Sequence, residues 1–121
     1  MVGYNLGTVE SYFADVVWER EPILTLELIE ICKEKFNWKR TTTYTVLKRL
    51  CEGGVFKLEN STVTSLISRE NFYSAKSESF VEESFNGSLP AFIAAFTKRK
   101  KLSKKEIDEI RKMIDDYKPE E

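Results

Sequence analysis

The sequence predicts a mainly α-helical protein with a small β-hairpin wing. Three amphipathic helical patterns are followed by two short β-rich runs, which is the chain order of a winged helix-turn-helix domain. Beyond them, residues 72–121 carry only narrow apolar stripes that do not suffice for a separate core. We therefore expect residues 1–71 to form a winged-helix DNA-binding domain and residues 72–121 a helical dimerisation domain.

The first two helices are predicted from apolar spacing and from their boundary residues. One helix is expected to begin at Thr8 as its N-cap and to end before Pro22, because the residue preceding a proline avoids the helical conformation. A second is expected from about Thr25, again as the N-cap, to Lys35. The apolar positions of the two helices are Val9, Tyr12, Phe13, Val16 and Val17, then Leu24, Leu28, Ile29, Cys32 and Phe36.

A third helix and a hairpin complete the predicted winged helix. The helix runs from Thr41 to about Glu52 and is stopped by Gly53-Gly54. Two β-rich runs, 55–58 and 62–68, flank a turn at Glu59-Asn60-Ser61. The helix has these apolar positions: Val46, Leu47, Leu50 and Cys51.

The second half contains three further helical patterns. The first covers Phe72 to Phe85 and ends at Asn86-Gly87, and the second opens at Gly87 or Ser88. Ser103 and Glu106 then match a capping box in front of a third helix. The apolar positions of these last two helices are Leu89, Phe92, Ile93 and Phe96, then Ile107, Ile110, Ile114 and Tyr117.

These apolar stripes need to be covered by another surface. A two-fold homodimer is the simplest solution, because it requires only one self-complementary surface. The alternative is that the stripes fold back onto the N-terminal domain of a monomer. The expected dimerisation residues are Phe92, Phe96, Ile107, Ile110 and Ile114.

Several classes of chemistry are disfavoured by composition. The 121 residues include no histidine, so neither a Ser-His-Asp nor a Cys-His catalytic unit can be built within the chain. Cys32 and Cys51 alone supply no zinc site, and both occupy apolar helical positions, where we expect core thiols rather than a disulfide. The acidic pairs Glu82-Glu83 and Asp115-Asp116 are interpreted as solvated helix faces. We expect no catalytic residue, no metal and no cofactor.

The expected location is the cytoplasm, without membrane insertion. No apolar run approaches the roughly 18–20 residues that span a bilayer. The segment Met1–Thr8 also lacks the basic start and the long apolar stretch of a signal peptide.

Basic charge is concentrated around the third helix. Residues 33–57 contain seven basic and two acidic side chains, whereas residues 1–32 contain one basic and six acidic. A local basic patch is expected where a protein contacts DNA phosphates, although a solvated face of mixed charge is the alternative. Threonine hydroxyl and methyl groups can in addition contact bases. The expected DNA-binding residues are Thr41, Thr42, Tyr44, Thr45, Lys48 and Arg49.

The segment from Asn37 to Leu50 resembles a known recognition-helix motif. It matches Trp-x-x-x-Thr-x-x-Thr-x-x-x-Arg-Leu, which is typical of the penicillinase repressor family of bacterial winged-helix regulators. Similar residues occur at Leu6, Glu10 and Val17-Trp18, and from Phe85 to Arg111. The resemblance covers about residues 6–117.

This resemblance implies a homodimer that binds double-stranded operator DNA and represses transcription. It implies a membrane sensor peptidase as a further partner, because family repressors in the β-lactam branch are cleaved at an Asn-Phe bond. The matching bond here is Ala95-Phe96, in which the Phe is kept and the Asn is replaced; the apolar stripe of this helix is the alternative reason for Phe96. Two further features depart from the family: the wing lacks its basic residue and Tyr-x-Tyr-like strand, and Tyr44 stands where members often carry Arg. A winged-helix module that binds protein rather than operator DNA is therefore the alternative function.

Overall fold

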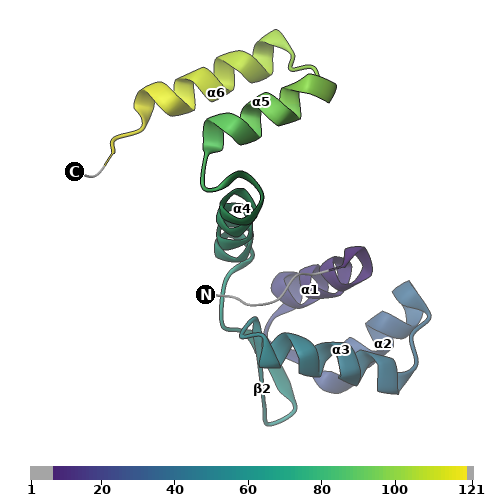
Figure 1. The fold of residues 1–121 in the computed structure, drawn as a ribbon. Coiled ribbons are helices and arrows are strands. Elements are labelled where there is room, and N and C mark those ends of the chain that lie inside the picture. The colour runs from purple at the N-terminus through teal and green to yellow at the C-terminus, as the bar shows by residue number, and fades with distance from the viewer. Residues whose placement is uncertain (1–6, 120–121) are drawn as a thin grey trace. The chain divides into compact units, whose positions relative to one another are not determined.

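The computed structural model describes residues 7–119, so Leu6 of the family resemblance lies outside the described residues. Among the described residues the chain folds into six helices and three short strands (Figure 1). Two compact units are separated between Ser79 and Phe80, within the fourth helix. The elements are α1 (Thr8–Arg20), β1 (Ile23–Leu24), α2 (Thr25–Phe36), α3 (Arg40–Glu52), β2 (Phe56–Glu59), β3 (Thr62–Ser65), α4 (Arg69–Phe85), α5 (Leu89–Arg99) and α6 (Lys104–Asp116).

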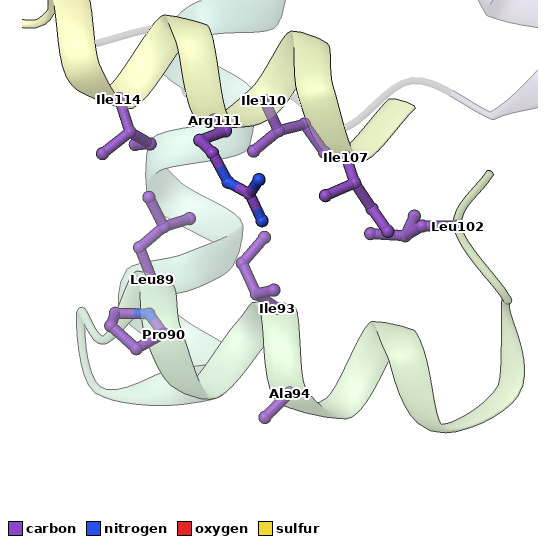
Figure 2. A pocket seen from close by; sticks show the side chains of 9 residues that line it. All are labelled: Leu89, Pro90, Ile93, Ala94, Leu102, Ile107, Ile110, Arg111 and Ile114. Carbon is purple, nitrogen blue, oxygen red and sulfur yellow. The ribbon is translucent and has the colours of Figure 1, made fainter. Parts of the chain in front are cut away.

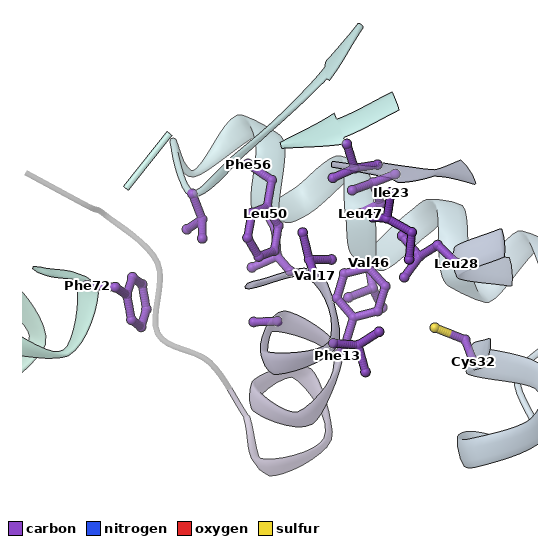
Figure 3. Close-up of a cluster of buried hydrophobic side chains, with 14 residues drawn as sticks. Phe13, Val17, Ile23, Leu28, Cys32, Val46, Leu47, Leu50, Phe56 and Phe72 are labelled. Atoms are coloured by element: carbon purple, nitrogen blue, oxygen red, sulfur yellow. The ribbon is translucent and has the colours of Figure 1, made fainter. Parts of the chain in front are cut away.

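The first unit has a continuous apolar core, shown in Figure 3. Its helices contribute at the spacing that the sequence predicts, so that Leu28 and Cys32 of α2 and Leu47 and Leu50 of α3 are buried. Leu24, predicted on the apolar face of the second helix, belongs to β1 and is exposed. In α1 the prediction is only partly right. The side chain of Tyr12 is at the edge of the buried face and that of Val9 is in the uncovered first turn, and both are exposed. The core consists of Phe13, Ala14, Val16, Val17, Ile23, Leu28, Cys32, Val46, Leu47, Leu50, Val55, Phe56, Val63 and Phe72.

Three antiparallel strands form the wing, in the order β1-β3-β2. The predicted turn is correct: Asn60 and Ser61 both have positive φ angles, 53° and 58°, as a tight hairpin of matching twist requires. Strand β1 was not predicted, and it changes the start of α2. The Thr25 N–H donates to the Ser61 carbonyl at 2.9 Å, and Leu24 takes the N-cap position instead of Thr25.

Strand β3 is shorter than predicted, because the chain leaves the sheet after Ser65. The Ile67 carbonyl accepts a 3.0 Å hydrogen bond from the indole N–H of Trp18 on α1. The predicted cap at Thr8 is also wrong: Gly7 is the N-cap and Thr8 is the first helical residue. Ser11 instead donates its hydroxyl to the Gly7 carbonyl at 3.0 Å.

The second unit contains α5 and α6, with boundaries that follow the sequence signals. Asn86 and Gly87 both have positive φ angles and separate α4 from α5. Ser88 caps α5 by accepting the Ala91 N–H at 3.1 Å. The Ser103–Glu106 capping box of α6 is confirmed, with both of its hydrogen bonds at 3.1 Å. Within residues 7–119, no helix is both long and apolar enough to cross a membrane.

Candidate nucleic-acid interface

Helices α2 and α3 form a helix-turn-helix whose turn is fixed by Asn37 and Trp38. Asn37 adopts the left-handed conformation, with φ 55°, and its N–H donates to the Lys33 carbonyl at 3.1 Å, which ends α2. The Trp38 ring stacks on Phe13 at a centroid distance of 5.8 Å and contacts Phe36 at 5.1 Å. Trp38 therefore anchors the start of α3 to the core.

One face of α3 is buried and the opposite face is open. Thr43 belongs to the buried face, together with the apolar positions of the helix, so it takes no part in the open face. The predicted DNA-contacting residues all lie outside that buried face. Five are exposed and Tyr44 is half-buried: Thr41, Thr42, Tyr44, Thr45, Lys48 and Arg49.

The Thr45 hydroxyl is already engaged within the helix. Its Oγ1 donates to the Thr41 carbonyl at 2.8 Å. The hydroxyl proton is thus used, and what remains for an outside partner is the methyl group and the oxygen lone pairs. Such a group suits apolar contact with a thymine methyl or acceptance of a hydrogen bond from a base.

The N-terminal end of α3 is strongly electropositive. Its N-cap residue, Lys39, makes no side-chain cap, and no acidic residue occupies the first turn. Lys33 and Lys39 line a cavity of about 540 Å³ beside Trp38, together with Glu30 and Arg40, and neither lysine has an ion-pair partner in the described part of the chain. Free helix amides, the helix dipole and unpaired cations together favour a phosphate group here.

Arg49 of α3 forms an ion pair with a residue of another helix. Its guanidinium lies 3.4 Å from the carboxylate of Glu10 on α1, and the Arg49 side chain stays 51% exposed. Exposed ion pairs of this kind contribute about 0–1 kcal/mol, so a phosphate can compete for the guanidinium at small cost. The pair joins α1 to α3.

The wing offers little positive charge. Its one cation, Lys57, lies 3.4 Å from Glu59 on the same strand. Leu58 is 44% exposed and borders a cavity of about 360 Å³ between β2 and α3, which Tyr44 and Cys51 also line. The exposed basic and threonine side chains of the candidate interface are therefore concentrated on α3 rather than on the wing.

Both cysteine thiols lie in surroundings that raise their pKa. Burial raises the pKa of the Cys32 thiol to about 11, despite a hydrogen bond with Thr43 that lowers it. Burial also raises the pKa of Cys51, so neither thiol is activated as a nucleophile. Across residues 7–119, no group of three or more Cys, Asp or Glu side chains is placed to hold a metal ion.

The predicted dimerisation residues fall into two groups. Ile107, Ile110 and Ile114 of α6 face α5 across an open apolar groove of about 610 Å³, into which the Arg111 side chain extends (Figure 2). From α5 the groove is lined by Leu89, Pro90, Ile93 and Ala94, and from the turn by Leu102.

Phe92 and Phe96 belong instead to an aromatic cluster. The Phe92 ring lies 5.9 Å from Phe80, 5.6 Å from Phe85 and 6.0 Å from Phe96. Phe80 and Phe96 remain about half exposed, and no described residue of α5 or α6 is buried. The Ala95-Phe96 bond lies within α5, and the Phe96 carbonyl accepts the Lys100 N–H at 3.1 Å.

Comparison with known proteins places the chain in a family. The family described as penicillinase repressor matches residues 6–116. The penicillinase repressor of Bacillus licheniformis is 27% identical over 118 residues, covering 94% of this chain and 92% of that protein. The methicillin resistance regulatory protein MecI of Staphylococcus aureus is 23% identical over 115 residues, covering 92% and 94%. Because the family match extends over nearly the whole sequence, the chain belongs to the penicillinase repressor family.

Proposed function

We propose that this chain is a dimeric, sequence-specific DNA-binding transcriptional repressor that works in the cytoplasm. The observation that carries the proposal is the open face of α3, where Thr41, Thr45 and Lys48 project from a helix whose start is fixed by Trp38. The unpaired cations at the N-terminal end of the same helix add a site for phosphate. In this proposal residues 1–71 bind operator DNA and residues 72–121 dimerise.

The dimer is supported by the exposed apolar surface of α5 and α6. Ile107 and Ile110 are each 39% exposed and Ile114 is 62% exposed, beside half-exposed phenylalanines. A contiguous apolar surface of this kind is typical of an obligate interface. A two-fold dimer would present two copies of α3 to half-sites about one helical turn apart, or a multiple of it.

A protein-interaction module is the second candidate. It is favoured by the lack of net positive charge on the wing, where Glu59 neutralises Lys57. Such a module would use the same scaffold without contacting phosphates, so its partner binding would depend much less on salt.

Capture of genomic DNA fragments by the purified protein, followed by sequencing, tests the proposal. We expect enrichment of a few fragments that share a dyad sequence. Binding to an enriched fragment should fall steeply between about 50 and 200 mM salt, because each phosphate contact releases a counterion. A scrambled fragment of equal length is the control. Absence of any enriched sequence would favour the interaction module instead.

A further inference from the structure

Arg40, the first residue of α3, lies against an aromatic ring. Its guanidinium carbon is 5.8 Å from the centroid of the Tyr44 ring, one helical turn later. Arg40 is exposed and has no ion-pair partner in the described part of the chain. A cation above a ring face at this distance is attracted to it, and at an exposed site the interaction is modest.

The Tyr44 ring is suited to hold that guanidinium in place. Tyr44 is half-buried and borders the cavity between α3 and β2 together with Leu47, Cys51 and Leu58. A half-buried ring has fewer open rotamers than a fully exposed one, so it can support the side chain that lies over it. The contact therefore restricts the rotamers of Arg40 before any ligand binds, which lowers the entropic cost of recognition.

We propose that Arg40, positioned by Tyr44, reads a guanine base in the major groove. The inference rests on the proposed operator binding and specifies one base in it. The first residues of a recognition helix contact base edges in helix-turn-helix proteins. A guanidinium donates two parallel hydrogen bonds, and guanine presents the matching acceptors N7 and O6.

Lys39 provides the matched comparison for this role. It is the adjacent cation at the same helix end and is likewise exposed, but it makes no cation–π contact with any ring among residues 7–119. A point charge of that kind suits a phosphate, whose binding needs no fixed orientation. If Arg40 reads a base and Lys39 does not, their alanine variants will differ in how the loss of DNA affinity depends on base sequence, rather than in the size of that loss.

The experiment starts by selecting preferred operators from random DNA with the full-length protein. Arg40→Ala should lose preference for one G·C pair in each half-site and bind the selected operator about 5–150-fold more weakly, the range expected for a base contact. Arg40→Lys, which keeps the charge, should lose the same preference. Tyr44→Ala should weaken preference at that same pair, whereas Lys39→Ala should weaken binding to all sequences alike.

Replacing the critical guanine by 7-deazaguanine removes the N7 acceptor and preserves base pairing. The wild-type protein should lose affinity for this operator, and Arg40→Ala should bind both operators equally. Circular dichroism melting verifies that each variant is folded. If Arg40→Ala does not fold, Arg40→Lys alone tests whether Arg40 reads the guanine. If Arg40→Ala and Arg40→Lys keep the wild-type base preferences, the inference is wrong while operator binding stands. A wild-type protein that selects no sequence would overturn both.

Discussion

The carboxylate of Glu21 accepts two kinds of hydrogen bond from Ser65. The backbone N–H of Ser65 lies 2.8 Å from Glu21 Oε1, and the Ser65 hydroxyl lies 2.7 Å from Oε2 and 2.8 Å from Oε1. Glu21 directly follows α1 and Ser65 ends β3, so the contact joins the first helix to the last strand of the wing. The side chain thus satisfies a backbone donor at the point where the chain leaves the sheet.

Glu21→Ala should therefore lower the free energy of unfolding by about 1–3 kcal/mol, because it leaves the partly buried Ser65 N–H without an acceptor. Glu21→Gln should cost less, since its amide oxygen can still accept that hydrogen bond. Urea denaturation measures both values. Glu19→Ala, an exposed neighbouring carboxylate, is the control. Equal stability of Glu21→Ala and wild type would show that the contact contributes nothing.

The elements that could be predicted from the sequence are those with local causes. Gly53, Asn86-Gly87 and the Ser103–Glu106 capping box end or start helices through contacts within a few residues. Strand β1 could not be predicted, because Ile23 is extended only through its pairing with Val63, 40 residues later. The helix α2 begins at Thr25 as predicted, but its N-cap is Leu24 rather than Thr25, whose N–H bonds to the Ser61 carbonyl.

The contacts of the candidate interface also separate into those that local sequence spacing predicts and those that it does not. Helical periodicity alone distinguishes buried Thr43 from exposed Thr41 and Thr45. The Arg40–Tyr44 contact also has a local signal, because side chains four residues apart are neighbours on a helix. The Arg49–Glu10 pair has none: it joins helices 39 residues apart, and spacing does not indicate which carboxylate Arg49 will meet.

Thr45 variants should distinguish a methyl contact from a hydroxyl contact with DNA. Thr45→Ala should relax base preference at one position at a cost of roughly 1–3 kcal/mol. Because the hydroxyl proton is bound to the Thr41 carbonyl, Thr45→Val should keep most of the preference if the methyl group meets a thymine. Competition binding with single-base operator variants makes the comparison.

Lys48→Ala should act differently from Thr45→Ala. Lys48 is exposed on the same face, and a phosphate contact there would support binding to every sequence. The variant should bind all DNA more weakly and reduce the dependence of log affinity on log salt by about one unit. If Thr45→Ala and Lys48→Ala lose equal DNA affinity on every sequence, Thr45 reads no base.

Introducing two charged residues into the groove between α5 and α6 should abolish the dimer. The double variant Ile110→Asp and Ile114→Asp places carboxylates where the proposed interface of more than ~2,000 Å² requires apolar contact. Light scattering should show monomers or unfolded chain. Met113→Asp is the matched control, since Met113 is on the same helix, is 68% exposed and does not line the groove. A folded dimer of the double variant would refute the assignment.

Alkaline pH should destabilise the protein through Cys32. Burial raises its pKa from 9.0 to about 11, so above pH 9 the unfolded chain loses the thiol proton first. The folded state binds more protons there, and its stability must fall as pH rises from about 9 to 11. Urea denaturation of wild type and Cys32→Ala over this range isolates the effect, because the other titrating groups are shared. Parallel pH profiles would mean that Cys32 does not contribute.

Cleavage of Ala95-Phe96 by a sensor peptidase is a prediction that rests on the position of this bond in the family resemblance. Ala95 replaces the Asn of the family's bond, and the apolar stripe of α5 is a sufficient alternative reason for Phe96. Both residues are exposed, but their peptide bond lies inside α5, so a protease requires local unfolding of that helix. The run Lys98–Lys101 that follows would favour such unfolding by self-repulsion; the alternative is a solvated segment without that effect. A cut would detach α6 with its apolar positions, and the resulting monomer would lose the gain in effective concentration that linked half-sites provide.

An immunoblot of the producing cells after exposure to a β-lactam detects cleavage of the Ala95-Phe96 bond directly. A fragment ending near residue 95 should appear as repression is lifted. Phe92→Leu is the matched control, because it alters the aromatic cluster around Phe96 and leaves the bond itself unchanged; this variant should still be cut. An intact band throughout derepression would mean that the protein is released by another signal, or without cleavage at this bond.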